Sequence, residues 1–185
     1  IVDFFSYKKS KKIKYEFGSF DFCIARNVIA HTPNPNDIFK GVSNLMNNKS
    51  IFVIEVPHLE NIYKDNQYDN MFHEHIGFHS IQSIEDLCFK SNLKIVNVEK
   101  IDSQGGSIRC YISKKQSKIK KDNKIKLFLY NERKIGLFKL KTWIDFSKKV
   151  NEHKKKLNNF LKKIKNKNKN ISAYGASGKG HLLLQ

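Results

Sequence analysis

Hydrophobic residues in the first 112 positions occur in two alternating patterns. Short apolar runs predict a buried strand at 20–25 and further strands at 50–56, 95–98 and 108–112. Apolar residues spaced by three and four predict helices at 36–46 and 83–92, capped by Asn36-Asp37 and Ser83. Strands alternating with helices indicate a doubly wound α/β sheet, and the last two strands form an antiparallel edge pair.

The pattern changes after residue 113. Mostly apolar residues then repeat at intervals of three and four, which predicts one long amphipathic helix: Phe146, Val150, His153, Leu157, Phe160, Leu161 and Ile164. A short strand at 171–174, a glycine-rich turn at 175–180 and the start of a helix at 181–184 follow. We therefore expect an α/β unit at 1–113, a helical connector at 114–170 and the beginning of a second α/β domain at 171–185. Because those last elements cannot bury themselves, and no initiator Met is present, we expect a piece of a longer protein.

The formal net charge is +18, and it is unevenly distributed. Residues 114–170 hold 21 of the 35 lysine and arginine residues but only four of the 17 acidic residues. The basic residues are nearly all lysine, whereas arginine is favoured for bidentate phosphate and guanine contacts. This composition favours a solvated helix face over a nucleic-acid site.

The composition also limits the cellular setting. The sequence has no apolar run long enough to cross a membrane, and Ile1–Phe5 lacks the layout of a secretory signal. Cys23, Cys88 and Cys110 are single and widely spaced. They indicate free thiols in a reducing cytoplasm and neither a disulfide framework nor a zinc clip.

The densest cluster of titratable residues is His73-Glu74-His75, preceded by Phe72 and followed by His79. If this segment is extended, His73 and His75 share one face and Glu74 lies on the other. That arrangement would suit a pair of metal ligands or a base beside a binding residue. The metalloprotease pattern H-E-x-x-H is absent, because Gly77 stands where its second histidine would be. Further metal ligands would have to come from His31, His58 or His79.

Polar residues also follow two of the predicted strands. His31 comes just after the first strand, and Glu55 and His58 lie at the end of the second. In open α/β sheets ligands bind in the crevice beyond the carboxyl ends of the strands. We therefore expect three stretches to deliver histidine and glutamate to one edge of the sheet.

The glycine-rich turn at 175–180 joins a predicted strand to a predicted helix. Such a turn can hold an anion with backbone N–H groups, or it can be a tight turn without a ligand. It is not a P-loop, because the four-residue gap and the hydroxyl after the lysine are missing. Its candidate anion-binding residues are Gly175, Lys179 and Gly180.

Five motifs in order resemble the family of SAM-dependent sugar C-methyltransferases. They are Ala30-His31-Thr32-Pro33-Asn34-Pro35 with Gly41, Glu55-Val56-Pro57-His58, His73-Glu74-His75, Gly105-Gly106-Ser107-Ile108-Arg109, and Tyr174-Gly175-Ala176 with Lys179-Gly180. The resemblance implies a central Rossmann-like domain that binds SAM, followed by a C-terminal Rossmann-like domain. It also implies that this chain starts after the SAM glycine loop, and that zinc belongs only to a preceding N-terminal part.

The resemblance also implies a chemistry and a set of residues. A ring carbon next to a ketone in a nucleotide-linked sugar loses a proton to a base and then receives a methyl group. His75 is the expected base, and His31 and Glu74 orient the sugar and stabilise the enolate. The expected substrate contacts are Phe72, His73, Glu55, His58, Ser107 and Arg109. Phe72 stands where the family often has tyrosine. We expect a monomer with a nucleotide-sugar substrate and no nucleic-acid or membrane partner. A noncatalytic or metal-binding module with a basic interaction helix is the alternative.

Overall fold

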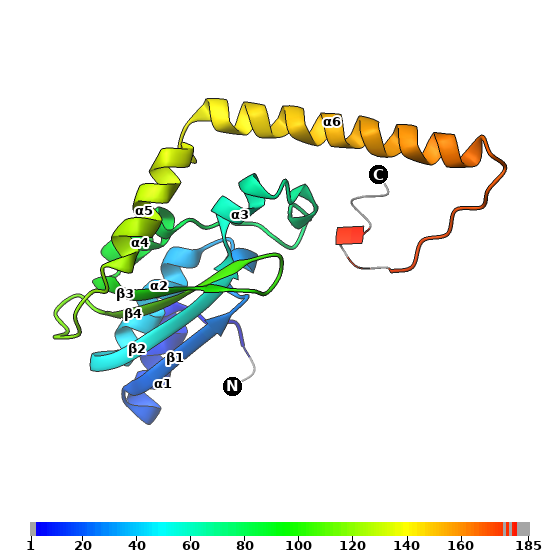
Figure 1. Ribbon diagram of the computed structural model, residues 1–185. Coiled ribbons are helices and arrows are strands. Elements are labelled where there is room, and N and C mark those ends of the chain that lie inside the picture. The colour runs from blue at the N-terminus through cyan, green and yellow to red at the C-terminus, as the bar shows by residue number, and fades with distance from the viewer. Residues whose placement is uncertain (1–2, 176, 178, 181–185) are drawn as a thin grey trace.

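The computed structural model describes residues 3–175, 177 and 179–180. A four-stranded sheet carries helices on its core side, and a long helix extends away from it (Figure 1). The strands are β1 (Phe20–Arg26), β2 (Met46–Pro57), β3 (Leu93–Ile101) and β4 (Ser107–Lys114). The α-helices are α1 (Tyr7–Phe17), α2 (Pro35–Leu45), α3 (Leu59–Lys64), α4 (Ile81–Lys90), α5 (Lys124–Ile135) and α6 (Leu140–Lys165). Two short 3-10 helices are η1 (Ile29–His31) and η2 (Tyr68–Asn70).

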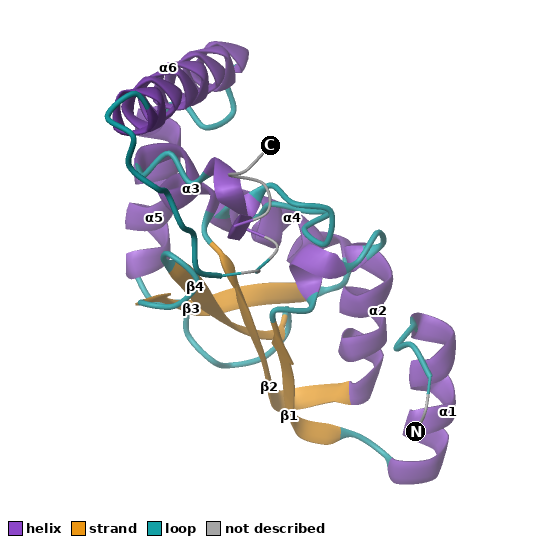
Figure 2. Ribbon diagram, turned by 90° about the vertical axis from the view of Figure 1, so that its right-hand side faces the viewer, coloured by secondary structure: helices purple, strands orange, loops and turns teal. Residues whose placement is uncertain are grey.

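The sheet has the strand order β1-β2-β4-β3. β1 and β2 are parallel, whereas β4 is antiparallel to both β2 and β3. The α/β class and the antiparallel pair are thus confirmed. The parallel strands both end near η1 and α3 (Figure 2), so the residues that follow them meet at one edge of the sheet.

The core lies between the sheet and the helices α2 and α4. Alternate residues of β2 and β4 are fully buried, as the two-residue period of a strand requires: Phe52, Ile54, Val56, Ile108, Cys110 and Ile112. Phe39 of α2 packs edge-on against Phe52, with ring centroids 5.5 Å apart. Ile81 and Ile84 of α4 are fully buried in the same cluster.

The predicted helices 36–46 and 83–92 are confirmed as α2 and α4, but their predicted caps are wrong. The side chain of Asn34, not Asn36 or Asp37, accepts a hydrogen bond from the backbone N–H of Asp37. Pro35 occupies the first turn of α2, where proline is favoured because its missing N–H has no helical partner. Ser80 caps α4, and Ser83 completes a capping box with it.

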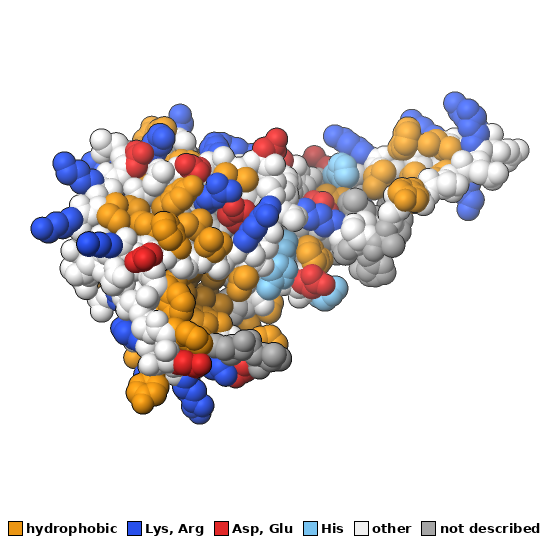
Figure 3. All heavy atoms as spheres, turned by 90° about the horizontal axis from the view of Figure 1, so that it is seen from below, with side chains coloured by type: hydrophobic (Ala, Val, Ile, Leu, Met, Phe, Trp, Pro, Cys, Tyr) orange, Lys and Arg blue, Asp and Glu red, His pale blue; other side chains and the backbone are white. Residues whose placement is uncertain are grey.

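β1 is formed as predicted, but the expectation that it is buried is wrong. Its Ala25 faces the core, while Phe22 and Ile24 on the opposite face are 70% and 75% exposed. β1 lies at the end of the strand order, so among the described residues β2 alone pairs with it. Together with Phe5, Ile13 and Val28, these residues line an apolar groove of about 420 Å³. Hydrophobic side chains are visible across the surface of the sheet-bearing part in Figure 3.

The predicted long amphipathic helix is confirmed as α6, which has 26 residues. α1 and α3 were not predicted, and α5 was not recognised as a separate helix within the predicted helical connector at 114–170. α1 and α5 are rich in lysine, and α3 lies in a stretch of asparagine, aspartate and tyrosine that reads as a loop. Each of these helices packs on the rest of the protein through only a few apolar side chains, for example Ile125 of α5, which is buried in the common core.

The predicted strand at 171–174 is wrong. Residues 171–175 form no regular structure, and Tyr174 is fully exposed. A strand is stabilised by hydrogen bonds to a neighbouring strand, and the sheet that the structure describes consists of β1 to β4 only. The predicted helix at 181–184 lies outside the described residues. No helix in residues 3–175 has both the length and the apolar composition needed to span a membrane.

Candidate active site

Two of the predicted catalytic residues, His31 and His75, meet beyond the carboxyl ends of β1 and β2. Their ring centroids are 4.9 Å apart, with the rings edge to face. The ring of Phe72 lies 4.4 Å from that of His75 on another side. His31 closes η1, directly after β1, whereas Phe72 and His75 come from the loop before α4. The structure therefore brings together residues that are more than forty positions apart in the sequence.

His73 and Glu74 do not join this group. The backbone N–H of His75 donates to the carbonyl of Phe72 at 2.9 Å, which closes a tight turn over residues 72–75. The side chains of His73 and Glu74 at the corners of this turn are 83% and 61% exposed. The sequence-based premise of an extended segment is wrong, and His73 and His75 do not share a face.

A hydrogen bond determines which nitrogen of His75 carries a proton. The Nδ1 atom lies 2.8 Å from the carbonyl oxygen of Asn70. Because a carbonyl oxygen can only accept, Nδ1 must be the donor, and Nε2 of the neutral ring carries the free lone pair. Partial burial lowers the pKa of His75, and the nearby His31 and Lys179 also lower it, against the hydrogen bond to Asn70 and the charge of Glu74. His75 is therefore a neutral imidazole near pH 7 with an available Nε2.

The backbone holds the His75 loop against η1. The N–H groups of Ile76 and Gly77 both donate to the carbonyl of Ala30, at 2.9 and 3.0 Å. Ala30 precedes His31, so these two bonds set the distance between the two histidines. Gly77 leaves room for His79, since a Cβ atom at position 77 would lie 3.2 Å from Nε2 of that ring.

Glu55 and Arg109 pair across neighbouring strands. Nε of Arg109 donates to Glu55 Oε1 at 2.7 Å, and Nε of Arg26 lies 3.0 Å from Oε2 of the same carboxylate. Glu99 on β3 reaches Arg109 at 3.8 Å and accepts from Tyr111 at 2.9 Å. Both predicted residues thus lie near the carboxyl edge of the parallel strands. Glu55 is nearly buried, and the Arg109 side chain keeps 34% of its surface exposed.

His58 and Ser107, which were also predicted as substrate contacts, are buried. His58 is fully buried, and its Nε2 lies 3.0 Å from Oε1 of Glu132 on α5. Ser107 is 2% exposed, and its hydroxyl donates to the carbonyl of Ser103 at 2.9 Å. In this conformation both side chains support the site from inside the protein and do not line its surface.

The glycine-rich segment at 175–180 is described only in part. Gly175 has φ +129°, a conformation that other residues rarely adopt, and the N–H of Gly180 donates to the hydroxyl of Ser177 at 3.2 Å. The charge of Lys179 contributes to the lowered pKa of His75, so this lysine lies on the side of the molecule that carries the histidine pair. A short local turn with a nearby cation is compatible with anion binding.

The described residues fit neither a metal ion nor a complete SAM site. Among residues 3–175, 177 and 179–180, no three His, Cys, Asp or Glu side chains are placed to share a metal ion. Neither parallel strand is followed by glycine: Asn27-Val28 follows β1 and His58-Leu59 follows β2. The glycine turn that approaches a cofactor in such folds is therefore not formed after these strands.

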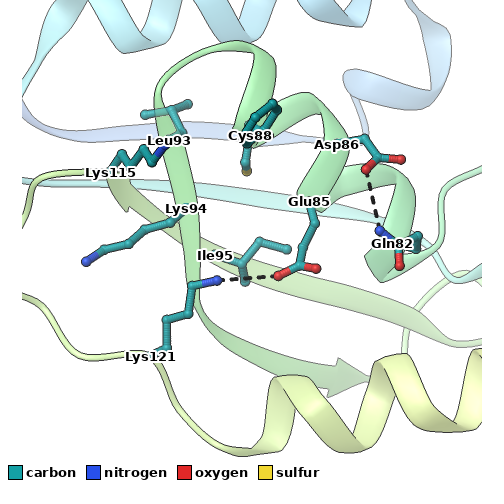
Figure 4. A pocket seen from close by; sticks show the side chains of 10 residues that line it. Gln82, Glu85, Asp86, Cys88, Leu93, Lys94, Ile95, Lys115 and Lys121 are labelled. Carbon is teal, nitrogen blue, oxygen red and sulfur yellow. Dashed lines mark hydrogen bonds and ion pairs between the residues drawn. The ribbon is translucent and has the colours of Figure 1, made fainter.

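A separate groove of about 350 Å³ lies between α4, β3 and the segment after β4 (Figure 4). Within it Nζ of Lys121 lies 3.5 Å from a carboxylate oxygen of Glu85, and the side-chain amide of Gln82 donates to Asp86 at 3.4 Å. None of the predicted catalytic residues lines this groove.

The sequence reasoning missed two important groups. The carbonyl of Asn70 fixes the tautomer of His75, and backbone atoms leave no signal in a sequence. Glu132 forms a hydrogen bond with His58, but it lies in the lysine-rich connector, where a single glutamate carries no signal.

Comparison with known proteins supports two adjoining regions. Residues 2–98 match the family model of a methyltransferase domain, and residues 102–185 match the model of the C-methyltransferase C-terminal domain. C-methyltransferase NovU of Streptomyces niveus is 27% identical over 180 residues, which cover 97% of this chain and 43% of that protein. The chain thus spans less than half the length of this curated relative.

Solved structures align with a smaller part of the chain. The alignment with magnesium protoporphyrin IX methyltransferase (ChlM) of Synechocystis PCC 6803 with bound SAH covers 52% of this chain and 45% of that protein's chain, at 10% identity and a TM-score of 0.42. A SAM-dependent methyltransferase of Thermotoga maritima covers 53% and 56%, at 13% identity and a TM-score of 0.43.

Proposed function

From the premise that this chain belongs to the methyltransferase family, we propose that the whole protein is a SAM-dependent C-methyltransferase with His75 as its general base. Its substrate is a nucleotide-linked keto-deoxysugar, methylated at a ring carbon next to the ketone. The match of residues 102–185 to a C-methyltransferase C-terminal domain supports transfer to carbon. The choice of a sugar rests on the five ordered motifs of the sequence.

One observation carries the assignment of His75. Its Nδ1–H donates to the carbonyl of Asn70 at 2.8 Å, so the lone pair of Nε2 is available to accept a proton. Partial burial and the nearby His31 and Lys179 lower the pKa of the imidazole and keep the ring neutral at physiological pH. A neutral, oriented imidazole is what proton abstraction next to a carbonyl requires.

The reaction that these residues support has a simple proton balance. The C–H bond next to the ketone breaks, its proton moves to Nε2 of His75, and its electrons form the enolate. SAM, when bound, would supply the methyl group to that carbon, and its broken S–CH₃ bond would leave its electrons on the sulfur of the demethylated product. The charge on the enolate oxygen needs a nearby donor. His31, whose ring lies 4.9 Å from that of His75, is the candidate donor and orients the sugar.

The remaining predicted residues are proposed to contribute to the site in different ways. Phe72 packs on His75 and shapes an apolar wall, and it has no hydroxyl to contact the sugar. Arg109, oriented by Glu55, and Lys179 with Gly175 and Gly180 are proposed to meet the anionic nucleotide part. Glu74 and His73 lie on the exposed corners of the turn, so we assign them to the rim of the site.

Hydrogen exchange of the substrate tests this function directly. In the full-length protein in D₂O, without SAM or with its demethylated product, the sugar's acidic C–H should exchange for deuterium. His75→Ala should lower the exchange rate by about 10²- to 10⁴-fold, the usual contribution of a general base, with substrate Kd within a few fold. Lys90→Ala, at an exposed position of α4 with no assigned role, is the control and should exchange nearly normally. Wild-type exchange in His75→Ala would disprove the assignment.

A further inference from the structure

The loop that carries His75 is held at both ends by residues of the helical connector. We propose that the connector helices α5 and α6 position the general base, His153 of α6 through Tyr68 and Glu132 of α5 through the first turn of α4. These are positioning residues that do not touch substrate. The proposal rests on the proposed function of His75. It adds a role for the helical connector, which the charge pattern alone predicts to be a solvated helix face.

The first contact lies at the N-terminal end of the loop. The hydroxyl of Tyr68 lies 2.9 Å from Nδ1 of His153, with the two rings edge to face and their centroids 5.7 Å apart. Tyr68 and Asn70 belong to the same 3-10 turn, η2. The carbonyl of Asn70 is the acceptor for Nδ1–H of His75. A shift of η2 therefore moves the group that orients the base.

α6 is itself anchored close to this contact. Trp143 and Phe146 lie 6.1 and 6.3 Å from the ring of Tyr63 on α3, and Nζ of Lys149 lies 5.0 Å from the centre of the same ring. Such aromatic and cation–π contacts fix the first half of the helix. Figure 1 shows α6 passing over α3 and then extending beyond it. His153 is thus presented to Tyr68 by a helix whose first half is held in place.

The second contact lies at the C-terminal end of the loop. Glu132 is fully buried and accepts hydrogen bonds from the backbone N–H groups of Ile81 and Gln82, at 2.6 and 3.2 Å. A carboxylate at this position suits the positive end of the helix dipole of α4. His58 completes the group, and the next residue, Leu59, donates its N–H to the carbonyl of His79 at 3.0 Å. The end of the loop is therefore tied to α5 and β2 together.

These contacts leave His75 between two fixed points. The loop runs from η2, which is held by α6, to the first turn of α4, which is held by α5. Its middle is held by the carbonyl of Ala30. The orientation of a catalytic group matters strongly, since a displacement of about 1 Å can lower a rate by about 10²-fold. The connector thus acts on the rate of proton transfer without contact with the sugar.

The test separates positioning from binding and from folding. In the full-length protein, Tyr68→Phe removes one hydroxyl, and His153→Ala removes its partner. Each change should lower the deuterium exchange rate of the sugar by about 10- to 10²-fold, with substrate Kd unchanged within about threefold. Because the two residues act as one pair, the double variant should be no slower than either single variant. His153→Gln, which keeps an acceptor oxygen, should recover most of the rate.

Lys154→Ala is the matched control, because this neighbouring side chain is exposed and should leave the rate within about twofold. Glu132→Gln probes the other end of the loop and should also slow exchange. If that variant does not fold, the Tyr68 and His153 variants still decide the question. Normal exchange in both of them would overturn the proposal, as would a rise in Kd equal to the loss of rate.

The two proposals fail in different ways. Exchange that persists in His75→Ala disproves the general base, whatever the His153 variants do. Exchange that is lost in His75→Ala but normal in Tyr68→Phe and His153→Ala disproves only the positioning role of the connector.

Discussion

His58 and His75 lie close together in the sequence and have opposite surroundings. His58 is fully buried, and its Nε2 is bonded to Glu132, which also binds two N–H groups of α4. His75 is half-buried, and its single hydrogen bond to a carbonyl leaves Nε2 open beside His31. His58 was predicted to contact substrate from its place after a strand, and His75 was expected to be the base from the family resemblance, whereas Glu132 was not predicted.

The difference between the two groups lies in what remains available. In the His58–Glu132 group both side chains are fully buried and Nε2 of His58 is paired, so the group contributes to the free energy of unfolding and exposes no side-chain atom to a ligand. In the His31–His75 group a proton acceptor remains, and its pKa is lowered by burial, by His31 and by Lys179. The histidine of each group is a candidate for chemistry by its residue type. Burial and hydrogen-bond partners show that the His31–His75 group, and not the His58–Glu132 group, keeps an accessible proton acceptor.

The largest expected effect is on stability. Glu132→Ala leaves His58 and the first turn of α4 without their common partner and should lower the free energy of unfolding by about 3–5 kcal/mol. His75→Ala, in the open group, should change it by less than about 1 kcal/mol. Urea unfolding of the full-length variants measures both values. Equal effects would show that the two groups do not differ in the way the contacts indicate.

The next effect concerns the pH dependence of exchange. A general base must be neutral, so the rate should fall about tenfold per pH unit below the pKa of His75, and the midpoint should lie below the ordinary value of about 6.5. Because the folded-state pKa is lowered, the stability contributed by this group is present above pH 6.5 and is lost as the pH falls. His31→Gln removes one of the charges that lower this pKa and should move the midpoint upward. A midpoint above 6.5 in the wild type would contradict the burial argument.

The smallest effect is expected on the exposed half of α6. Lys→Gln changes at Lys154, Lys155, Lys156 and Lys162 remove four exposed charges that have no partner among the described residues. Exposed charges contribute little, so kcat/KM of the full-length protein should stay within about twofold. Lys149 is excluded from this set, since it lies over Tyr63. A loss above tenfold would mean that the basic face meets the substrate.

Much of the fold could be predicted from local patterns. All four strands were expected, as were α2, α4 and α6, because their apolar residues follow the periods of strand and helix. α1 and α3 were missed, and α5 was not separated from the rest of the predicted helical connector, since lysine-rich and asparagine-rich segments carry few apolar residues. The strand at 171–174 was expected wrongly, because an apolar run does not form a strand without a neighbour to pair with.

The candidate site shows the same division. The sequence by itself determined the strands, the residues that follow their carboxyl ends and the motifs that nominate His31 and His75. Those features depend on neighbours within a few positions. Only the tertiary structure decided that a turn over 72–75 directs His73 and Glu74 outward, that Glu132 closes over His58, and that Asn70 leaves Nε2 of His75 open. The physical reason is that burial depends on residues distant in the chain, as Glu132 is from His58, and that backbone groups such as the Asn70 carbonyl leave no signal in residue types. These partners determine which histidine can accept a proton.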